Sequence, residues 1–179
     1  MLKIHVPATE LFDYNKERFY TVPECDLCLE HSLLSISKWE SIHHKPLLED
    51  IQLTNDELID YIRCMTINRN VPDLVYNCLS NKQIAKIQDY MDDKMTATWF
   101  SENQKQPSNG QKITAELLYS WMIDLGIWKE CEQWHIRKLL TLIRVRSEEL
   151  KPKDKKSSRE LASHYKNLKA ARRAAKRKH

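Results

Sequence analysis

The stretch ECDLCLEHSLLSISKWESIHHKPLL, residues 24–48, decides the predicted fold. If it is drawn as a helix at 100° per residue, Cys25 and Trp39 fall on one side with other apolar residues between them. Leu27 and Leu34 fall on the opposite side. A helix that is apolar on two opposite sides is typically buried between neighbouring elements. The pattern therefore predicts one buried helix around which the rest of the chain is organised.

The expected ends of this central helix follow from local signals. Thr21 and Glu24 have capping-box spacing, and a proline such as Pro23 is tolerated in the first turn of a helix. Pro46 is expected to end the helix, because the residue before a proline is pushed out of the helical region.

The segment before the central helix has a different pattern. Residues 2–6 (LKIHV) alternate and contain β-branched side chains, and residues 18–22 (RFYTV) are similar. Residues 13–16 (DYNK) between them are typical of a turn. We expect a small N-terminal β-hairpin formed by these two strands and packed against the helices, because an isolated hairpin is only marginally stable.

Further helices are expected downstream. Capping boxes predict helix starts at Thr54–Glu57, Ser80–Gln83 and Ser157–Glu160. Thr114 should open another helix, and Gly126 lies where a closing glycine belongs. A short helical turn is expected at residues 72–78 and a last body helix at 129–147, whereas the polar residues 101–112 are expected to form an exposed loop.

Together these elements predict a mainly α fold: a compact helical domain with a small N-terminal β-hairpin and a basic C-terminal helical arm. Of the 179 residues, 29 are Lys or Arg and 25 are Asp or Glu. Residues 151–179 hold twelve of the former and two of the latter, a net charge of +10, which leaves −6 on residues 1–150. We therefore expect a helical body over 1–150 and a basic linker and arm over 151–179.

No catalytic, metal or cofactor site is expected. The chain has two glycines and lacks the glycine-rich motifs that cradle phosphates. Cys25 and Cys28 form a CxxC pair without a second pair of ligands, so we interpret them as core thiols on one face of the central helix. His31 and His135 are expected in helices, and His43 at a helix end, where histidine commonly interacts with the helix dipole. The chain is therefore interpreted as a non-enzyme.

Partner binding is the function that the remaining residues favour. Tryptophans serve either as core anchors or as interface anchors. Arginine and lysine near the C-terminus suit an acidic protein surface or a nucleic-acid backbone. The candidate partner-binding residues are Trp39, Trp99, Trp128, Trp134, Arg172, Arg173, Lys176, Arg177 and Lys178.

A resemblance sharpens this interpretation. The blocks SLLSISKWESIHHKPLL, DELIDYIRCMT, MTATWF, TAELLYSWMI and WHIRKLLTLIRV occur in this order. Together they resemble a family of small proteins from the virion gene cluster of long-tailed bacteriophages, the tail assembly chaperones, over residues 1 to about 175. The resemblance implies binding to the helical tape measure protein and assistance to tail tube assembly in the host cytoplasm, with self-association as a further possibility.

Two other functions remain open from the sequence. The basic arm would also suit a nucleic-acid-binding phage protein, such as a packaging or regulatory factor. The chain would equally suit a structural component of the virion. No membrane span is expected, because no run of about 18 apolar residues exists. The N-terminus also lacks the long apolar core of a signal peptide.

Deleting residues 152–179 is expected to leave the body folded, with a melting temperature within a few degrees of the full chain, because the body carries its own apolar patterns. Partner binding should weaken, most strongly at low salt, where charge attraction is least screened. Thermal unfolding and a binding titration at two salt concentrations measure both effects. A truncated chain that fails to fold would show that the arm belongs to the core.

Overall fold

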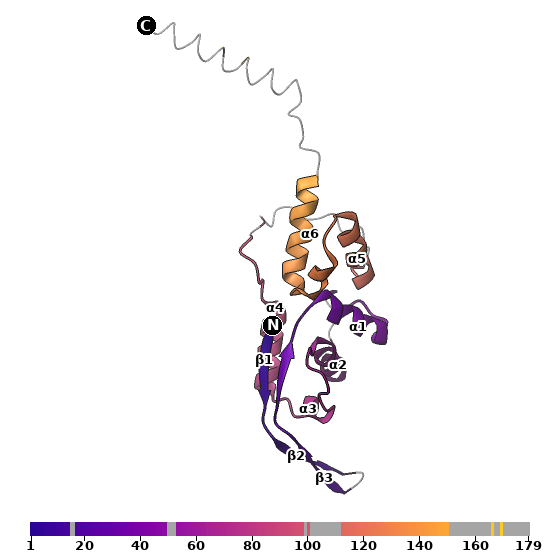
Figure 1. The fold of residues 1–179 in the computed structure, drawn as a ribbon, viewed down its shortest axis with the longest axis vertical. Coiled ribbons are helices and arrows are strands. Elements are labelled where there is room, and N and C mark those ends of the chain that lie inside the picture. Colours follow the sequence, from indigo (N-terminus) through magenta and orange to yellow (C-terminus); the bar gives the residue numbers. More distant parts are fainter. Residues whose placement is uncertain are drawn as a thin grey trace, which may run out of the picture. The chain divides into compact units, whose positions relative to one another are not determined.

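The computed structural model describes residues 1–14, 17–49, 53–98, 100, 112–150, 166 and 169 (Figure 1). The chain divides into two compact units, Met1–Arg146 and Ser147–His179. The first unit contains almost every described element. In chain order, the elements are β1 Leu2–Val6, β2 Thr9–Asp13, β3 Arg18–Val22, β4 Cys25–Leu29, α1 Leu33–His43, α2 Asn55–Met65, α3 Leu74–Asn77, α4 Asn81–Asp92, α5 Ala115–Asp124, the 3-10 helix η1 Lys129–Gln133 and α6 Ile136–Leu150.

The prediction of a mainly α fold is wrong. The described residues form two antiparallel two-stranded sheets, β1–β4 and β2–β3, beside the helices. The strands take up most of the first 29 residues, and β4 contributes two fully buried leucines, Leu27 and Leu29, to the core. The fold therefore combines helices with a β structure that is part of the core.

The two sheets form one long ribbon with a single register. Leu2 lies opposite Leu29, and every later pair keeps the same alignment out to the tip of β2–β3. Pro7 and Pro23 occupy the interruption between the sheets, where a residue without an N–H cannot complete the ladder. An N-terminal hairpin was correctly predicted, but residues 18–22 pair with β2 and not with residues 2–6.

The predicted central helix is wrong in its first half. Cys25–Leu29 is strand β4, because its buried and exposed residues alternate and its backbone pairs with β1. The predicted capping box at Thr21 and Glu24 does not form, since Thr21 belongs to β3. The helix starts instead at a capping box that the sequence analysis missed. The Ser35 N–H donates to Ser32 Oγ at 3.3 Å, and the Ser32 N–H donates to Ser35 Oγ at 3.0 Å.

Helix α1 nonetheless is a core helix. Leu33, Ile36 and Trp39 have no exposed surface. Trp39 also donates from Nε1 to the Glu57 carbonyl at 3.0 Å, which ties α1 to the start of α2. The helix ends at His43, followed by a left-handed residue, slightly before the proline that was expected to stop it.

The capping signals of the later helices are confirmed. The pairs Thr54–Glu57 and Ser80–Gln83 form reciprocal boxes at the starts of α2 and α4. Thr114 caps α5. Gly126 has a φ of 62° and closes α5, with Ile127 N–H donating to the Met122 carbonyl at 2.8 Å.

Several other predictions differ from the structure or lie outside its described part. The predicted helix 129–147 is divided into η1 and α6, because the chain is extended at Trp134 before α6 begins. Residues 101–111, the Ser157–Glu160 capping box and most of the basic arm lie outside the described residues. Lys166 and Lys169 are described and are helical.

Substitution of Ile36 by alanine should lower the free energy of unfolding by about 2–5 kcal/mol, the range for emptying a well-packed core site. Ile42 of the same helix is 62% exposed, so Ile42→Ala is a matched control that should change stability by less than about 0.5 kcal/mol. Urea titration measures both. Equal effects of the two substitutions would show that α1 is peripheral.

Candidate functional site

A buried polar cluster joins α1 and α2. His31 Nδ1 lies 2.5 Å from the Tyr61 hydroxyl, and Ser35 Oγ lies 3.3 Å from the same hydroxyl. Burial lowers the pKa of His31 to about 3, and it raises the pKa of Tyr61. Both groups are therefore neutral near pH 7, so Tyr61 donates to His31 Nδ1 and the ring proton of His31 is on Nε2.

His135 plays a related part at the start of α6. Its carbonyl accepts from the N–H groups of Lys138 and Leu139, and its Nδ1 accepts from the Arg137 N–H at 3.3 Å. Nε2 therefore carries the proton and donates to the Tyr90 carbonyl at 3.0 Å. Burial lowers the pKa of His135 as well. This imidazole caps α6 and attaches it to the last turn of α4.

The bonds of this cluster join helices. Ser35 Oγ donates to the Ser32 carbonyl at 2.8 Å. The same hydroxyl lies against the hydroxyl of Tyr61 and not against a histidine ring. The rings of His31 and His135 meet edge to face with centroids 5.2 Å apart. Both histidines were expected inside helices, whereas His31 precedes α1 and His135 precedes the first residue of α6.

Glu40 is a buried acidic residue outside this cluster, and the sequence analysis did not predict its role. It is 7% exposed, and its carboxylate accepts from the Leu47 N–H at 2.9 Å and from the Ala115 N–H at 2.7 Å. An acidic side chain from α1 thus caps the start of α5. In the sequence, the signal for this role was that Glu40 directly follows the core residue Trp39.

The CxxC pair does not form a joint site. Cys25 and Cys28 lie three residues apart in strand β4, so their side chains leave on opposite faces, contrary to the predicted common face. Both are partly exposed and both are free thiols. Among the described residues, no group of three or more His, Cys, Asp or Glu side chains could hold a metal ion.

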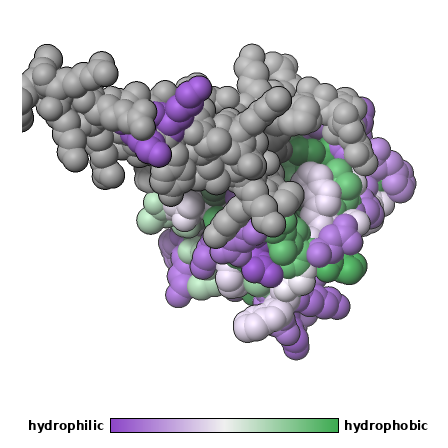
Figure 2. All heavy atoms as spheres, turned by 90° about the horizontal axis from the view of Figure 1, so that it is seen from above, coloured by the Kyte–Doolittle hydropathy of each residue, from purple (hydrophilic) through white to green (hydrophobic). Residues whose placement is uncertain are grey.

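Exposed apolar side chains lie where α5 turns into η1. Ile123 and Trp128 are each 79% exposed, and Trp134 is 38% exposed. We call these three residues the corner surface. Ile123 and Trp128 flank the turn that Gly126 closes. Figure 2 shows one face of the molecule, on which hydrophobic side chains are exposed among polar ones. Exposed large apolar side chains close together in the chain are candidates for an interaction site.

Charged groups border the corner surface. Asp124 and Glu130 are exposed beside Ile123 and Trp128 in the chain. The Lys138 ammonium lies 4.2 Å from the centroid of the Trp134 ring, a cation–π contact that holds this indole against α6. Because the exposed Lys129 lies between Trp128 and Glu130 in the chain, the corner surface combines exposed apolar anchors with a border of both charges.

The structure separates the tryptophans that were predicted to bind partners. Trp128 and Trp134 belong to the corner surface. Trp39 has no exposed surface, so it cannot contact a partner in this structure and acts as a core anchor. Trp99 lies outside the described residues, as do the five basic arm residues Arg172, Arg173, Lys176, Arg177 and Lys178.

A second exposed aromatic group lies at the tip of the ribbon and was missed. Phe12 and Phe19 face each other across β2–β3 with ring centroids 4.9 Å apart, and Tyr14 meets Phe12 edge to face at 5.0 Å. Phe19 is 70% exposed and Tyr14 is 85% exposed. In the sequence, the signal for this group was the presence of aromatic residues at positions 12, 14 and 19, within and on both sides of the predicted turn.

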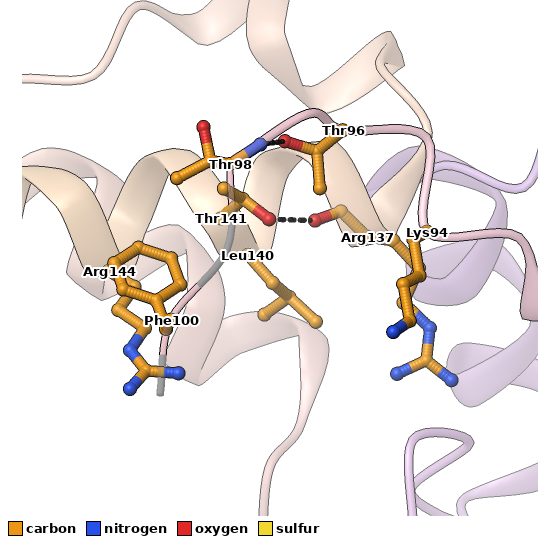
Figure 3. A pocket seen from close by; sticks show the side chains of 8 residues that line it. All are labelled: Lys94, Thr96, Thr98, Phe100, Arg137, Leu140, Thr141 and Arg144. Carbon is orange, nitrogen blue, oxygen red and sulfur yellow. Dashed lines mark hydrogen bonds between the residues drawn. The ribbon is translucent and has the colours of Figure 1, made fainter. Parts of the chain in front are cut away.

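A basic pocket is the third surface feature (Figure 3). It is a hollow of about 340 Å³ between α6 and the segment that follows α4. Three cationic and three threonine side chains contribute to its lining, together with an aromatic and an aliphatic residue: Lys94, Thr96, Thr98, Phe100, Arg137, Leu140, Thr141 and Arg144.

The chain was compared with protein families, curated proteins and solved structures. No family model, no curated protein and no solved structure matches it. Within the described residues, no helix has the length and apolar character needed to cross a membrane.

The buried histidines predict a loss of stability in acid. His31 has a folded pKa of about 3, and in the unfolded chain it should titrate near 6.5. Between these values the unfolded chain binds more protons, so the free energy of unfolding should fall by about 1.4 kcal/mol per pH unit from this group as pH decreases below 6.5. Urea titrations at pH 7.5 and 5.5 measure the slope.

The matched variants for this test are His31→Gln, which removes the buried titrating group, and His5→Gln, which removes an exposed histidine of β1. The first should flatten the pH dependence, and the second should leave it close to that of the unmodified protein. An unchanged slope in His31→Gln would show that His31 does not remain neutral in the folded chain.

Proposed function

We propose that this protein is a tail assembly chaperone of a long-tailed bacteriophage, which binds an amphipathic helix of the tape measure protein in the host cytoplasm. The observation that carries the proposal is the corner surface, where Ile123 and Trp128 are each 79% exposed. Such side chains act as anchors when an apolar helix face covers them. The ordered sequence blocks that resemble the chaperone family supply the identity of the partner.

The net charge of the body supports a helical partner with basic residues beside its apolar stripe. Asp124 and Glu130 would face lysine or arginine residues of the bound helix and Lys129 would face an acidic one, and such complementarity fixes orientation and speeds association. Residues 1–150 carry a net charge of −6, which favours the same partner at longer range.

A chaperone of this kind acts by covering apolar surface. A long helical protein that waits for tube subunits exposes apolar stripes that would otherwise associate with one another. Binding of one stripe at the corner surface would keep that segment soluble, and arriving tube subunits would then displace the chaperone. Self-association and a contact with the tail tube protein belong to the same proposal.

The experiment uses the proposed partner, the tape measure protein of the same phage, expressed in overlapping fragments with and without this full-length protein. Coexpression should raise the soluble yield of at least one fragment. Trp128→Ala and Ile123→Asp should each weaken its binding at least tenfold, a loss of about 1.4 kcal/mol or more, because exposed aromatic and aliphatic anchors dominate interface energies. Isothermal titration measures the affinity.

Ile42→Asp is the control, since Ile42 is 62% exposed on a different helix. It should leave binding within twofold of the unmodified protein. The melting temperatures of all three variants should stay within a few degrees, because the altered side chains are exposed. Equal affinity in the corner and control variants would refute the corner surface as the binding site.

A further inference from the structure

The two faces of the ribbon tip, formed by β2 and β3, have different surroundings. Successive side chains of a strand leave on opposite faces. On one face, Val22 has no exposed surface and Leu11 is partly buried against the core. On the other face, Phe12 lies opposite Phe19, and these side chains are 39% and 70% exposed. The tip therefore packs one face against the body and leaves an aromatic face uncovered.

Other segments bond to the ribbon at its base but not along β2. The Gln83 side-chain amide donates to the His5 carbonyl of β1 at 2.6 Å, and the Ile67 N–H donates to the Cys28 carbonyl of β4 at 2.8 Å. Strand β2 pairs with β3 on one edge, and among the described residues no backbone group pairs with its other edge. In Figure 1, β2 and β3 extend beyond the helices. An unpaired strand edge is a template for pairing with another strand.

The exposed face of β2 presents a row that is complementary to itself. Glu10, Phe12 and Tyr14 are alternate residues, and the Tyr14 ring meets the Phe12 ring edge to face at 5.0 Å. Within the described part of the chain, neither the Glu10 carboxylate nor the Tyr14 hydroxyl has a hydrogen-bond partner. When a second β2 runs antiparallel with Phe12 opposite Phe12, Glu10 of each copy faces Tyr14 of the other. The carboxylate can then accept from the phenolic hydroxyl.

We propose that two copies of this chain pair through the outer edges of β2, antiparallel and centred on Phe12, so that their ribbon tips form one four-stranded sheet. The contact is symmetric, so each pair of residues occurs twice. The aromatic side chains of both copies lie side by side across the new sheet, an arrangement that stabilises strand pairs. The inference rests on the proposed function only where that function includes self-association, and it uses no residue of the corner surface.

A second copy fits the tip better than a nucleic acid does. Among the described residues of the aromatic face, the one charged side chain is Glu10, and its carboxylate would repel a phosphate backbone. An unrelated strand could meet the same backbone edge, but a second copy also supplies a donor for each Glu10 and an acceptor for each Tyr14.

The test is sedimentation equilibrium of the full-length protein over a wide range of concentrations. The weight-average mass should rise from 21.3 kDa toward twice that value. Tyr14→Glu places a carboxylate opposite Glu10 of the other copy at two symmetric positions, and it should raise the dissociation constant of the dimer at least tenfold. Its melting temperature should stay within a few degrees, because Tyr14 is 85% exposed and follows the strand.

Glu10→Lys combined with Tyr14→Glu is the rescue variant. It places a lysine opposite a glutamate at both positions, so the dissociation constant should return to within threefold of that of the unmodified protein. Positions 10 and 14 of one strand are roughly 13 Å apart, so attraction within one copy is largely screened at physiological salt. Recovery therefore reports on charges that meet between copies.

A second pair of variants tests the centre of the contact. Phe12→Lys and Phe12→Glu should each remain monomeric alone, because like charges meet at position 12, and an equimolar mixture of the two should associate. The matched control is Ile42→Lys and Ile42→Glu, since Ile42 is 62% exposed outside the ribbon. Each control variant, alone or in the mixture, should leave the dissociation constant within twofold.

Four results would overturn the proposal. They are a mass that stays at 21.3 kDa at every concentration, a dimer that Tyr14→Glu leaves unchanged, a loss in Tyr14→Glu that the double variant does not restore, and a dimer that Trp128→Ala abolishes. Binding of the tape measure protein is measured separately with the corner variants, so this inference and the proposed function can fail independently.

Discussion

The junction between the start of α1 and the start of α6 is the contact on which the rest of the structure depends. Ser32 and His135 form an antiparallel bridge, and the Ile136 N–H donates to the His31 carbonyl at 2.7 Å. These bonds join residues more than 100 positions apart in the chain. From this junction, His31 reaches Tyr61 of α2, and His135 reaches the end of α4. One small polar cluster thus fixes four helices.

The cluster is stable only while its imidazoles are neutral. A second proton on His135 would occupy Nδ1, which accepts the N–H that caps α6, and a second proton on His31 would occupy the Nδ1 that accepts from Tyr61. Both bonds would be lost at side chains that are buried, where an unsatisfied polar group is costly. Burial opposes that protonation. Desolvation therefore makes the cluster costly to form, but it also keeps both imidazoles neutral, which is the form that holds the helices together.

The corner surface and the basic pocket both follow from this arrangement. Helix α6 packs its apolar residues Ile136, Leu139 and Ile143 into the core. A face beside this buried stripe supplies Arg137 and Arg144 to the basic pocket. Glu40 of α1 caps the start of α5, and the turn at the other end of α5 exposes Ile123 and Trp128. The same packing that buries one face of each helix exposes the other.

Local sequence determined the helices that begin at Thr54, Ser80 and Thr114 and the turn at Gly126, because capping and left-handed glycine depend on residues within one helical turn. The sequence also named Trp128 and Trp134 as candidate binding residues, and both are exposed in the structure. Tertiary structure decided whether Cys25–Leu29 is helix or strand, since five residues with apolar positions at both spacings fit either element until a partner strand pairs with them. It likewise decided that Trp39 is buried, that Glu40 caps a distant helix and that Lys94 and Arg144 line the same pocket. Each of these depends on contacts between residues far apart in the chain, and a single sequence carries no local signal for such contacts.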